Sequence, residues 1–581
     1  MSRNDQTYIH ATGPHFTSPQ RRRAPSRHNE QFEILGHSQC EKVLLARLQR
    51  LDDVPAKRAP PVGELVVPHE SDVDMGVPCT GNDHDHEMME GVPIPDAASD
   101  PSPRKRIVPD EEAIRLYDRW KDLLPKLIHP LRKYRQAIFR TPIAPEPPDA
   151  HQCQNASCGT GAASIICLFW DHFESRKIAY CTCTTLPEHL MSQGLFPTSP
   201  TQPRMAVSIA LLEFYFALFE RSGDAVTALA GALRNFYARH GWHMLDAKGQ
   251  PIRDPFRRGL GYAIQWYDAL STKVGCHLED IIDHTRGLVR DDVRPLHQVG
   301  TNPYEECASL LQRRCPACFA GTTFGRSEHE GYDIQLSVDG NFSQRHLRSA
   351  GDSPWFYQPE YFISKAQVDA VGVHISSQRK KPPNRSYIPK VPDEAVDSCE
   401  HGHDAADEHK TKTNKDIFDD TGVMALVCRH DIPIFLANID TPGEQQKYVL
   451  ALISTLFQYL PSRALIRILY DVACVVERSI ALYKLLPENI SSRISWSTSA
   501  MHAYGHEWSC QLVYNPRMSP GLGLTDGEGT EWFWSRSRKL IPITRTSARA
   551  RRIWLLDRQA GTISNELRDD LGDFLKRRLT R

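Results

Sequence analysis

The pattern of hydrophobic and polar positions separates a polar N-terminal region from a long stretch of periodic sequence. Residues 1–105 are rich in proline, histidine, aspartate, serine and arginine and show little periodicity. Because such a composition buries too little apolar surface to offset chain entropy, we expect this region to be disordered.

Helical periodicity dominates the next part of the chain. It covers residues 111–139, where prolines interrupt it, and 258–312. Between them, residues 205–242 are apolar enough to form a buried helical hairpin. We therefore expect a cysteine-cluster and helical domain at 106–245 and a helical linker region at 246–330.

From residue 332 the pattern changes to strands and helices. The predicted elements are a strand at 332–342, a strand hairpin at 422–430 and 432–439, a helix at 443–460, a strand at 464–471, a helix at 472–486, a strand at 493–500 and a helix at 501–514. The polar segment 376–416 is interpreted as an inserted loop. Three antiparallel strands followed by alternating elements are the order of an RNase H-like mixed α/β sheet. We place this core at 331–560, with a helical tail at 561–581.

An aspartate lies at the predicted C-terminal end of two of these strands. In an RNase H-like sheet the first and fourth strands are neighbours, which brings Asp339 in "SVDGNF" and Asp471 in "LYDVACVV" to one edge. Ligand sites in open α/β sheets favour that edge. Two carboxylates placed there repel each other unless a cation lies between them, which favours a divalent metal site. Taken singly, Asp339 is explained as a turn residue and Asp471 as a helix N-cap.

A two-metal site for phosphoryl transfer needs a third carboxylate, and two glutamates in "GLGLTDGEGTEWFWSRSRKL" compete for this role. Glu528 fits a capping box with Thr525 and so has a structural explanation. Glu531 lies in the first turn after Gly529, from where it can point at the sheet edge. We favour Glu531 and keep Glu528 as the alternative.

Cysteine pairs predict zinc sites. The N-terminus lacks the apolar core of a signal peptide and no apolar run is long enough to span a bilayer, so we expect an intracellular protein without membrane contact. In a reducing compartment, close cysteine pairs indicate metal binding more than disulfides. Four thiolates suit tetrahedral Zn²⁺, the alternative being unligated thiols: Cys153, Cys158, Cys181 and Cys183.

Two further cysteine and histidine motifs are incomplete by themselves. Cys315 and Cys318 in "RCPACF" form a half-site. The predicted helix 501–514 carries three residues spaced i, i+4, i+8 on one face, namely His502, His506 and Cys510. Cys428 and His430 in "CRHD" are candidates to share a zinc site with them. The alternatives for these residues are a packed helix face and contacts beside the active site.

Basic residues follow the proposed third carboxylate. The net charge of −1 indicates no particular class of partner, so a surface that binds nucleic acid must be a local cluster of basic residues. Clustered cations with aromatics at both ends suit phosphate binding and base stacking, with a solvated helix face as the alternative. The DNA-binding candidates are Arg536, Arg538, Lys539, Arg545, Arg549, Arg551 and Arg552. Short basic clusters, "SPQRRRAPSRH" and "SPRKRIVP", suit nuclear import, although isolated clusters also occur by chance.

Long consecutive stretches resemble the KDZ transposases, eukaryotic DDE transposases abundant in fungi. They include "RCPACF", "VDGNFSQRH", "YDVAC", "HAYGHEWSCQLVYNPR" and "GLGLTDGEGTEWFWSRSRKL". The stretch "YCTCTTLPEHLMSQGLFPTSPTQPRMAVSIALLEFY" resembles the cysteine-cluster domain found N-terminal to them. The resemblance covers about residues 150–560.

The resemblance implies cut-and-paste DNA transposition by an RNase H-like nuclease core. Its triad falls on Asp339, Asp471 and Glu531, which would hold Mg²⁺ or Mn²⁺, and the related hAT transposases place their glutamate in a similar setting. The implied partners are transposon ends and target DNA, the implied location is the nucleus, and a homo-oligomer is expected although no heptad run indicates one.

Two features depart from the family. Trp532 stands where its members usually have arginine, and they often continue beyond the equivalent of residue 581. These departures favour the runner-up interpretation, an inactive or domesticated transposase that binds DNA or chromatin. A third interpretation is an RNase H-like nuclease with another substrate, such as a repair nuclease.

Overall fold

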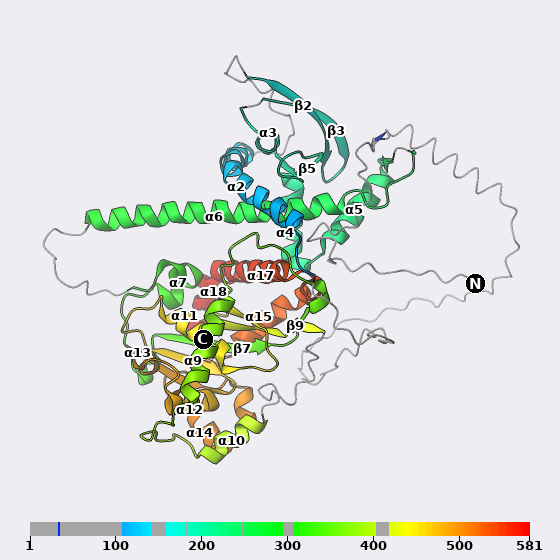
Figure 1. Ribbon diagram of the computed structural model, residues 1–581. Helices are drawn as coiled ribbons and strands as arrows, with labels where there is room; N and C mark the ends of the chain where they lie inside the picture. Colours follow the sequence, from blue (N-terminus) through cyan, green and yellow to red (C-terminus); the bar gives the residue numbers. More distant parts are fainter. Residues whose placement is uncertain are drawn as a thin grey trace, which may run out of the picture.

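The computed structural model describes most of the chain beyond residue 106 (Figure 1). The described residues are 33–34, 107–140, 158–181, 183–246, 248–293, 306–402 and 417–580. The predicted disorder of residues 1–105 therefore lies outside them, except for the short strand β1 (Glu33–Ile34), which pairs with β6 (Met244–Leu245). None of the described helices combines the length and apolar character needed to cross a bilayer.

The N-terminal part packs helices around a small sheet. Helix α2 (Glu111–Ile138) runs continuously through Pro125 and Pro130, so the predicted interruption is absent. The sheet was not predicted; its strand order is β3-β2-β5-β4. The strands are β2 (Thr160–Leu168), β3 (Phe173–Cys181), β4 (Leu195–Pro197) and β5 (Met205–Ser208), and the short helix α3 (Leu186–Ser192) precedes β4.

The predicted helical hairpin is confirmed as α4 (Ile209–Ser222) and α5 (Val226–Arg239). Gly223, at the end of α4, has a φ of 69°, a left-handed conformation that favours glycine. Helix α6 (Arg257–Val293) follows, and its second half extends to the left of this part in Figure 1. Along that half, apolar side chains are exposed at Leu278, Ile281, Ile282, Leu288 and Val289.

The predicted order of the C-terminal sheet is confirmed. Its five strands are arranged β11-β10-β7-β12-β13. They are β7 (Ile334–Asn341), β10 (Gly422–Cys428), β11 (Pro433–Ile439), β12 (Ile466–Tyr470) and β13 (Ile494–Ser497). Strand β7 is antiparallel to β10 and parallel to β12, and β12 is parallel to β13. The first and fourth strands are therefore neighbours, as the sequence predicted.

Helices cover both faces of this sheet. They include α9 (Lys365–Arg379), α11 (Gln446–Phe457), α12 (Ala473–Tyr483), α14 (Trp508–Tyr514), α15 (Gly529–Ser537), α16 (Ile541–Thr546), α17 (Arg549–Asp569) and α18 (Leu571–Leu579). Smaller elements are α7 (Ser309–Arg314), α8 (Pro316–Phe319), α13 (Glu488–Ser491), β8 (His346–Leu347) and β9 (Phe418–Asp420).

Two predicted elements differ from the structure. The segment 376–416 is not simply a loop, because its start belongs to α9 and it contains α10 (Asp393–Gly402). Helix α10 forms because Val396 and Cys399, one turn apart, are buried together. The predicted helix 501–514 is broken into a 3₁₀ turn at His502–Gly505 and helix α14, with extended backbone at His506. Gly505 favours this break because glycine loses the most backbone entropy in a helix.

One hydrophobic core crosses the predicted boundary between the N-terminal and catalytic parts. Trp266 of α6 packs edge-on against Phe356, and Phe356 packs against Trp554 of α17, with ring centroids 5.8 and 5.7 Å apart. A second core fills the other face of the five-stranded sheet, beneath α11 and α12. The two parts are therefore joined through α17.

Candidate active site and metal clusters

Asp339 and Asp471 lie at one edge of the sheet. Val338 is paired with Tyr470 in the parallel register of β7 and β12, so the next residue on each strand is one of these aspartates. We expected strand β7 to end at Asp339. It continues to Asn341, because Asp339 and the two residues after it still pair with β10.

Neighbouring side chains hold each aspartate. The indole N–H of Trp534 donates to Oδ2 of Asp339 at 2.7 Å. The Ser499 hydroxyl donates to Oδ1 of Asp471 at 2.7 Å, and Nδ1 of His502 lies 3.2 Å from the same oxygen. Burial, followed by the charges of Glu444 and Asp471, raises the pKa of Asp339 well above its ordinary value. Burial and the neighbouring negative charges therefore favour the protonated form of Asp339.

Glu444 is a fourth carboxylate at this edge, and sequence reasoning missed it. It lies just before α11, against the backbone of Gly340, and accepts a hydrogen bond from the Tyr470 hydroxyl at 3.0 Å. Burial and the charge of Asp471 raise its pKa to about 8. An acidic residue before a helix is a common cap, so only the fold shows that Glu444 faces Asp339 and Asp471.

The two competing glutamates lie on different sides of the aspartates. Glu531 is exposed and lines a cleft of about 410 Å³ with Asp339, Trp534 and Arg545. Glu528 instead accepts a hydrogen bond from the backbone N–H of Met501 at 2.9 Å, near His502. The predicted capping box is absent, because Glu528 itself precedes α15 without a side-chain cap and the Thr525 hydroxyl bonds to Gln335.

The acidic residues are spaced more widely than the cysteine clusters described next. Within the described ranges, Asp339, Asp471 and Glu531 do not form a group whose ligand atoms all lie within 4.8 Å of one another. Trp532 points away from the cleft, being 63% exposed and lining a separate cavity of about 600 Å³ with Arg429 and Arg578.

The first candidate metal cluster, named the Cys315 cluster, completes the predicted half-site. It consists of Cys315, Cys318, Cys428 and His430, whose ligand atoms lie within 4.8 Å of one another. Nδ1 of His430 is 3.4 Å from the Cys315 sulfur and 3.2 Å from the Cys318 sulfur. The prediction that "CRHD" shares its site with residues 502–510 is therefore wrong, because the hairpin turn between β10 and β11 places "CRHD" over α8 instead.

The second cluster, named the Cys399 cluster, consists of Cys399, Cys474, His506 and Cys510. Sequence reasoning found His506 and Cys510 but missed Cys399 of α10 and Cys474 of α12. His502 is not a member: the break after Gly505 removes it from the face of α14, and it contacts Asp471.

The third cluster, named the Cys158 cluster, brings together Cys158, Cys181 and Cys183. The sulfur atoms of Cys158 and Cys183 are 3.0 Å apart. The fourth predicted ligand, Cys153, lies outside the described residues.

The donor sets of these clusters fit zinc. Three cysteines and one histidine are a standard tetrahedral set for structural Zn²⁺. Burial raises the pKa of the Cys428 thiol, and the Cys510 thiol together with burial raises that of Cys474. Neutral thiols crowded in this way become thiolates when a divalent cation compensates their charge. The clusters can therefore bind zinc.

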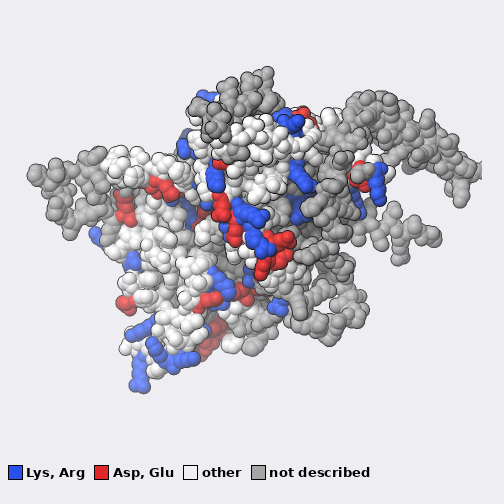
Figure 2. All heavy atoms as spheres, turned by 45° about the horizontal axis from the view of Figure 1, so that its top comes forward, with Lys and Arg blue, Asp and Glu red and all other residues white. Residues whose placement is uncertain are grey.

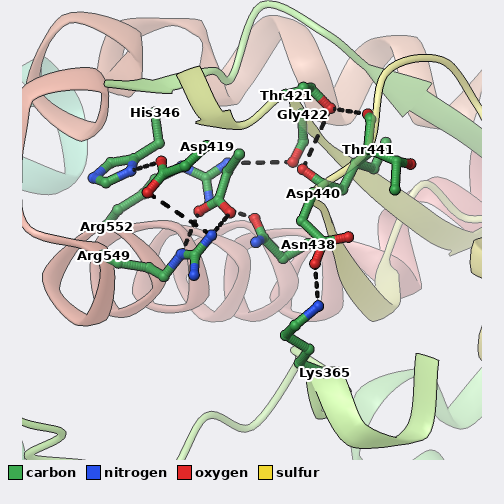
Figure 3. Close-up of polar contacts among 12 residues, drawn as sticks. His346, Lys365, Asp419, Thr421, Gly422, Asn438, Asp440, Thr441, Arg549 and Arg552 are labelled. Carbon is green, nitrogen blue, oxygen red and sulfur yellow. Dashed lines mark hydrogen bonds and ion pairs between the residues drawn. The ribbon is translucent and has the colours of Figure 1, made fainter. Parts of the chain in front are cut away.

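The basic segment divides into buried and exposed residues. Arg551 and Arg552 are almost fully buried, and Arg549 forms an ion pair with Asp420. Figure 3 shows Arg549 and Arg552 beside Asp419. Arg552 donates to the carbonyl oxygen of Gln344 at 2.6 Å. Arg549 and Arg552 hold α17 against β9 and β10, whereas Arg551 donates to Gln265 of α6. The burial of Arg551 and Arg552 contradicts their predicted DNA contact, and Arg549 is engaged by Asp420. The arginines also compensate the nearby acidic group of Asp419 and Asp420, where His346 bonds to Asp419 at 2.5 Å.

The other basic residues remain near the surface. Arg536 and Arg538 are exposed, although Arg536 also pairs with Glu566 at 3.2 Å, and Arg545 lines the cleft of Asp339. Lys539 is partly buried and donates to the carbonyl oxygen of Glu220. On the face drawn in Figure 2, blue and red side chains are interspersed, so no broad basic surface forms there.

The fold and the clusters define a mixed α/β protein with cysteine and histidine sites that can bind metal. Residues 332–563 match the family model of the Kyakuja-Dileera-Zisupton transposase, and residues 147–240 match that of the CxC1-like cysteine cluster associated with KDZ transposases. The chain therefore carries a KDZ transposase domain preceded by its associated cysteine cluster. No curated protein and no solved structure matched the chain.

Proposed function

We propose that the protein is a DNA transposase that cleaves transposon ends and joins them to target DNA in the nucleus. The observation that carries this proposal is the adjacency of Asp339 and Asp471 on parallel strands, within the part that matches the KDZ transposase. The strand order, with two antiparallel and two parallel pairings, supports an RNase H-like core.

The proposed catalytic residues are Asp339, Asp471 and Glu531. Their carboxylate oxygens suit Mg²⁺ or Mn²⁺, which would activate a water and stabilise the attacking and leaving oxygens of phosphoryl transfer. Glu531 is favoured over Glu528 because it shares a cleft with Asp339. Trp534 orients Asp339, whereas Ser499 and His502 orient Asp471.

The proposed reaction has two steps at phosphorus. Water attacks a phosphodiester at the transposon end, a P–O bond breaks, and a 3′-OH is released. That 3′-OH then attacks a phosphodiester of the target, forming a new P–O bond and releasing a target 3′-OH. Arg545, in the same cleft, and the exposed Arg538 are placed to contact phosphate.

Cleavage of terminal-repeat DNA by the purified chain tests the assignment. We expect Glu531→Gln to lower the cleavage rate at least about 100-fold, whereas Glu528→Gln keeps most of the activity, because only Glu531 faces the cleft. Undiminished cleavage by the Glu531 variant would sink this assignment and promote Glu528.

A second candidate is a DNA- or chromatin-binding protein derived from a transposase. Trp532 favours it, because this exposed side chain stands where the family resemblance leads us to expect arginine. This candidate predicts that the wild-type chain binds DNA but leaves it uncut with either Mg²⁺ or Mn²⁺.

We also propose that the protein assembles with itself through α6. Leu278, Ile281 and Leu288 are exposed and lie three and seven residues apart, which places them on one face of the helix. Acidic Glu279 and Asp280 precede basic Arg286 on the same half-helix. Asp283, Asp291 and Asp292 lie on the same half-helix and Arg286 pairs with Asp283, so the apolar face and not the order of charges carries this proposal.

A further inference from the structure

The Cys399 cluster lies directly behind Asp471. Cys474 is in the first turn of α12, three residues after Asp471, and His506 and Cys510 come from the segment that follows β13. The same segment supplies Ser499 and His502, whose side chains contact the Asp471 carboxylate. The aspartate is thus enclosed by a stretch of chain, 499–510, that the cluster anchors at its far end.

His506 connects the cluster to Asp471. Its Nε2 lies 2.7 Å from the backbone carbonyl oxygen of Asp471, and its Nδ1 lies 3.6 Å from the Cys474 sulfur. Because a carbonyl oxygen can only accept, Nε2 carries the proton and the lone pair of Nδ1 faces the thiols. A metal-ligating histidine characteristically donates its other N–H in this way, which fixes both the ring and its partner.

The remaining ligand, Cys399, comes from α10 in the polar insert. Several contacts hold α10 in place: Arg478 of α12 bonds to Asp397 at 2.6 Å and to Glu400 at 3.1 Å, and Ser398 donates to Glu507 at 2.7 Å. The backbone N–H of Glu507, next to His506, donates to the Cys399 sulfur at 3.3 Å. The insert therefore places the Cys399 thiol beside the backbone that carries His506.

We propose that zinc bound by Cys399, Cys474, His506 and Cys510 positions Asp471 through the His506 N–H, and that α10 completes this site. His506 is a positioning residue, because it acts through the backbone of Asp471. The consequence for catalysis rests on the proposed function, whereas the effect on metal binding at the acidic edge does not.

The decisive variant is His506→Cys in the full chain. It offers zinc a fourth thiolate but removes the N–H donor to Asp471. We expect zinc content by elemental analysis to match the wild type, while Mn²⁺ affinity at the acidic edge, followed by electron paramagnetic resonance, falls by about 10- to 100-fold. Wild-type Mn²⁺ affinity in this variant, with zinc retained, would overturn the positioning role and leave a cluster that only stabilises the fold.

A second variant tests the insert. Cys399→Ser should lose one equivalent of zinc and show a similar loss of Mn²⁺ affinity, whereas Cys276→Ser, which changes an exposed cysteine of α6, should behave as the wild type. Unchanged zinc content in Cys399→Ser would overturn the role of α10. The part of the Mn²⁺ resonance that is lost in Asp471→Asn is the signal of Mn²⁺ bound at the acidic edge.

The same variants separate the two proposals. If the wild-type chain cleaves DNA, both variants should cleave about 10- to 100-fold more slowly with unchanged DNA affinity. If the wild type does not cleave but Mn²⁺ affinity falls as described, the positioning role stands and the transposase proposal fails.

Discussion

At the scale of single residues, the acidic edge combines groups that titrate in unusual ranges. Glu444 shows this most clearly, because it is buried beside Asp471 and its pKa is raised from 4.5 to about 8. Between these two pH values the folded chain keeps a proton that the unfolded chain has released. Stability is therefore present near pH 4.5 and is lost as pH rises toward 8.

Glu444→Gln should remove this pH dependence. Each pH unit between the two pKa values costs about 1.4 kcal/mol, so the wild type should lose up to roughly 4 kcal/mol between pH 5 and pH 8 without added divalent cation. Urea unfolding at both pH values measures the loss. Glu444→Gln should lose less free energy of unfolding between these pH values than the wild type. Saturating Mg²⁺ should reduce the loss in the wild type. The control Glu488→Gln, at an exposed position, should show the same loss as the wild type. Parallel pH profiles for wild type and Glu444→Gln would contradict the prediction.

Sequence reasoning located the residues that local patterns mark. Asp339 and Asp471 lie at the ends of recognisable strands, so the strand order predicted from the sequence already placed them side by side. Glu444, Cys399 and Cys474 carry no such mark, because each is an ordinary residue at the start of or within a helix. Their roles come from packing between segments far apart in the chain, which one sequence does not show.

At the scale of elements, the strands of the five-stranded sheet and most helices followed from periodicity, whereas the N-terminal sheet and the burial of the basic segment did not. Clustered cations with aromatics at both ends suggested a DNA-binding face, and the alternative was a solvated helix face. The compensating Asp420 lies 129 residues before Arg549, and the carbonyl oxygen of Gln344 lies 208 residues before Arg552. Only the fold reveals that these arginines are buried.

Arg552→Ala and Arg538→Ala should therefore behave in opposite ways. Removing Arg552 takes a buried donor from the carbonyl oxygens of Gln344 and Gly422 and breaks its buried ion pair with Asp420, and should lower the free energy of unfolding by about 3–5 kcal/mol. Removing the exposed Arg538 should change stability by less than about 0.5 kcal/mol but reduce the salt dependence of DNA binding by about one phosphate contact. Denaturant unfolding and binding titrations at several salt concentrations measure both effects. Loss of stability in Arg538→Ala but not in Arg552→Ala would contradict our division of the basic segment into exposed and buried residues.

At the scale of the whole molecule, the N-terminal part and the part with the five-stranded sheet share a core through α17, while the second half of α6 projects from that core. Its exposed apolar side chains are the surface on which the proposed self-assembly depends. Burying them against a second copy would remove from water an apolar stripe that otherwise remains exposed.

Charging this stripe should give a monomer. Leu278→Asp combined with Ile281→Asp should lower the sedimentation coefficient of the full chain, because two carboxylates in an apolar seam repel their copies across the interface. Val373→Asp, at an exposed position on α9, serves as the matched control and should sediment as the wild type. Identical sedimentation of all three proteins would exclude α6 as the interface.

The Cys315 cluster also has a consequence for the order of folding. It joins Cys315 to His430 across 115 residues, and the strand β7 that lies between them must also pair with β12. Closing such long loops costs entropy before any contact repays it, so non-local pairings form slowly. A nascent chain cannot close this cluster until β10 has been made. Any zinc uptake there would thus be a late step, and until then the cysteines of "CPAC" would be open to oxidation and to competing metals.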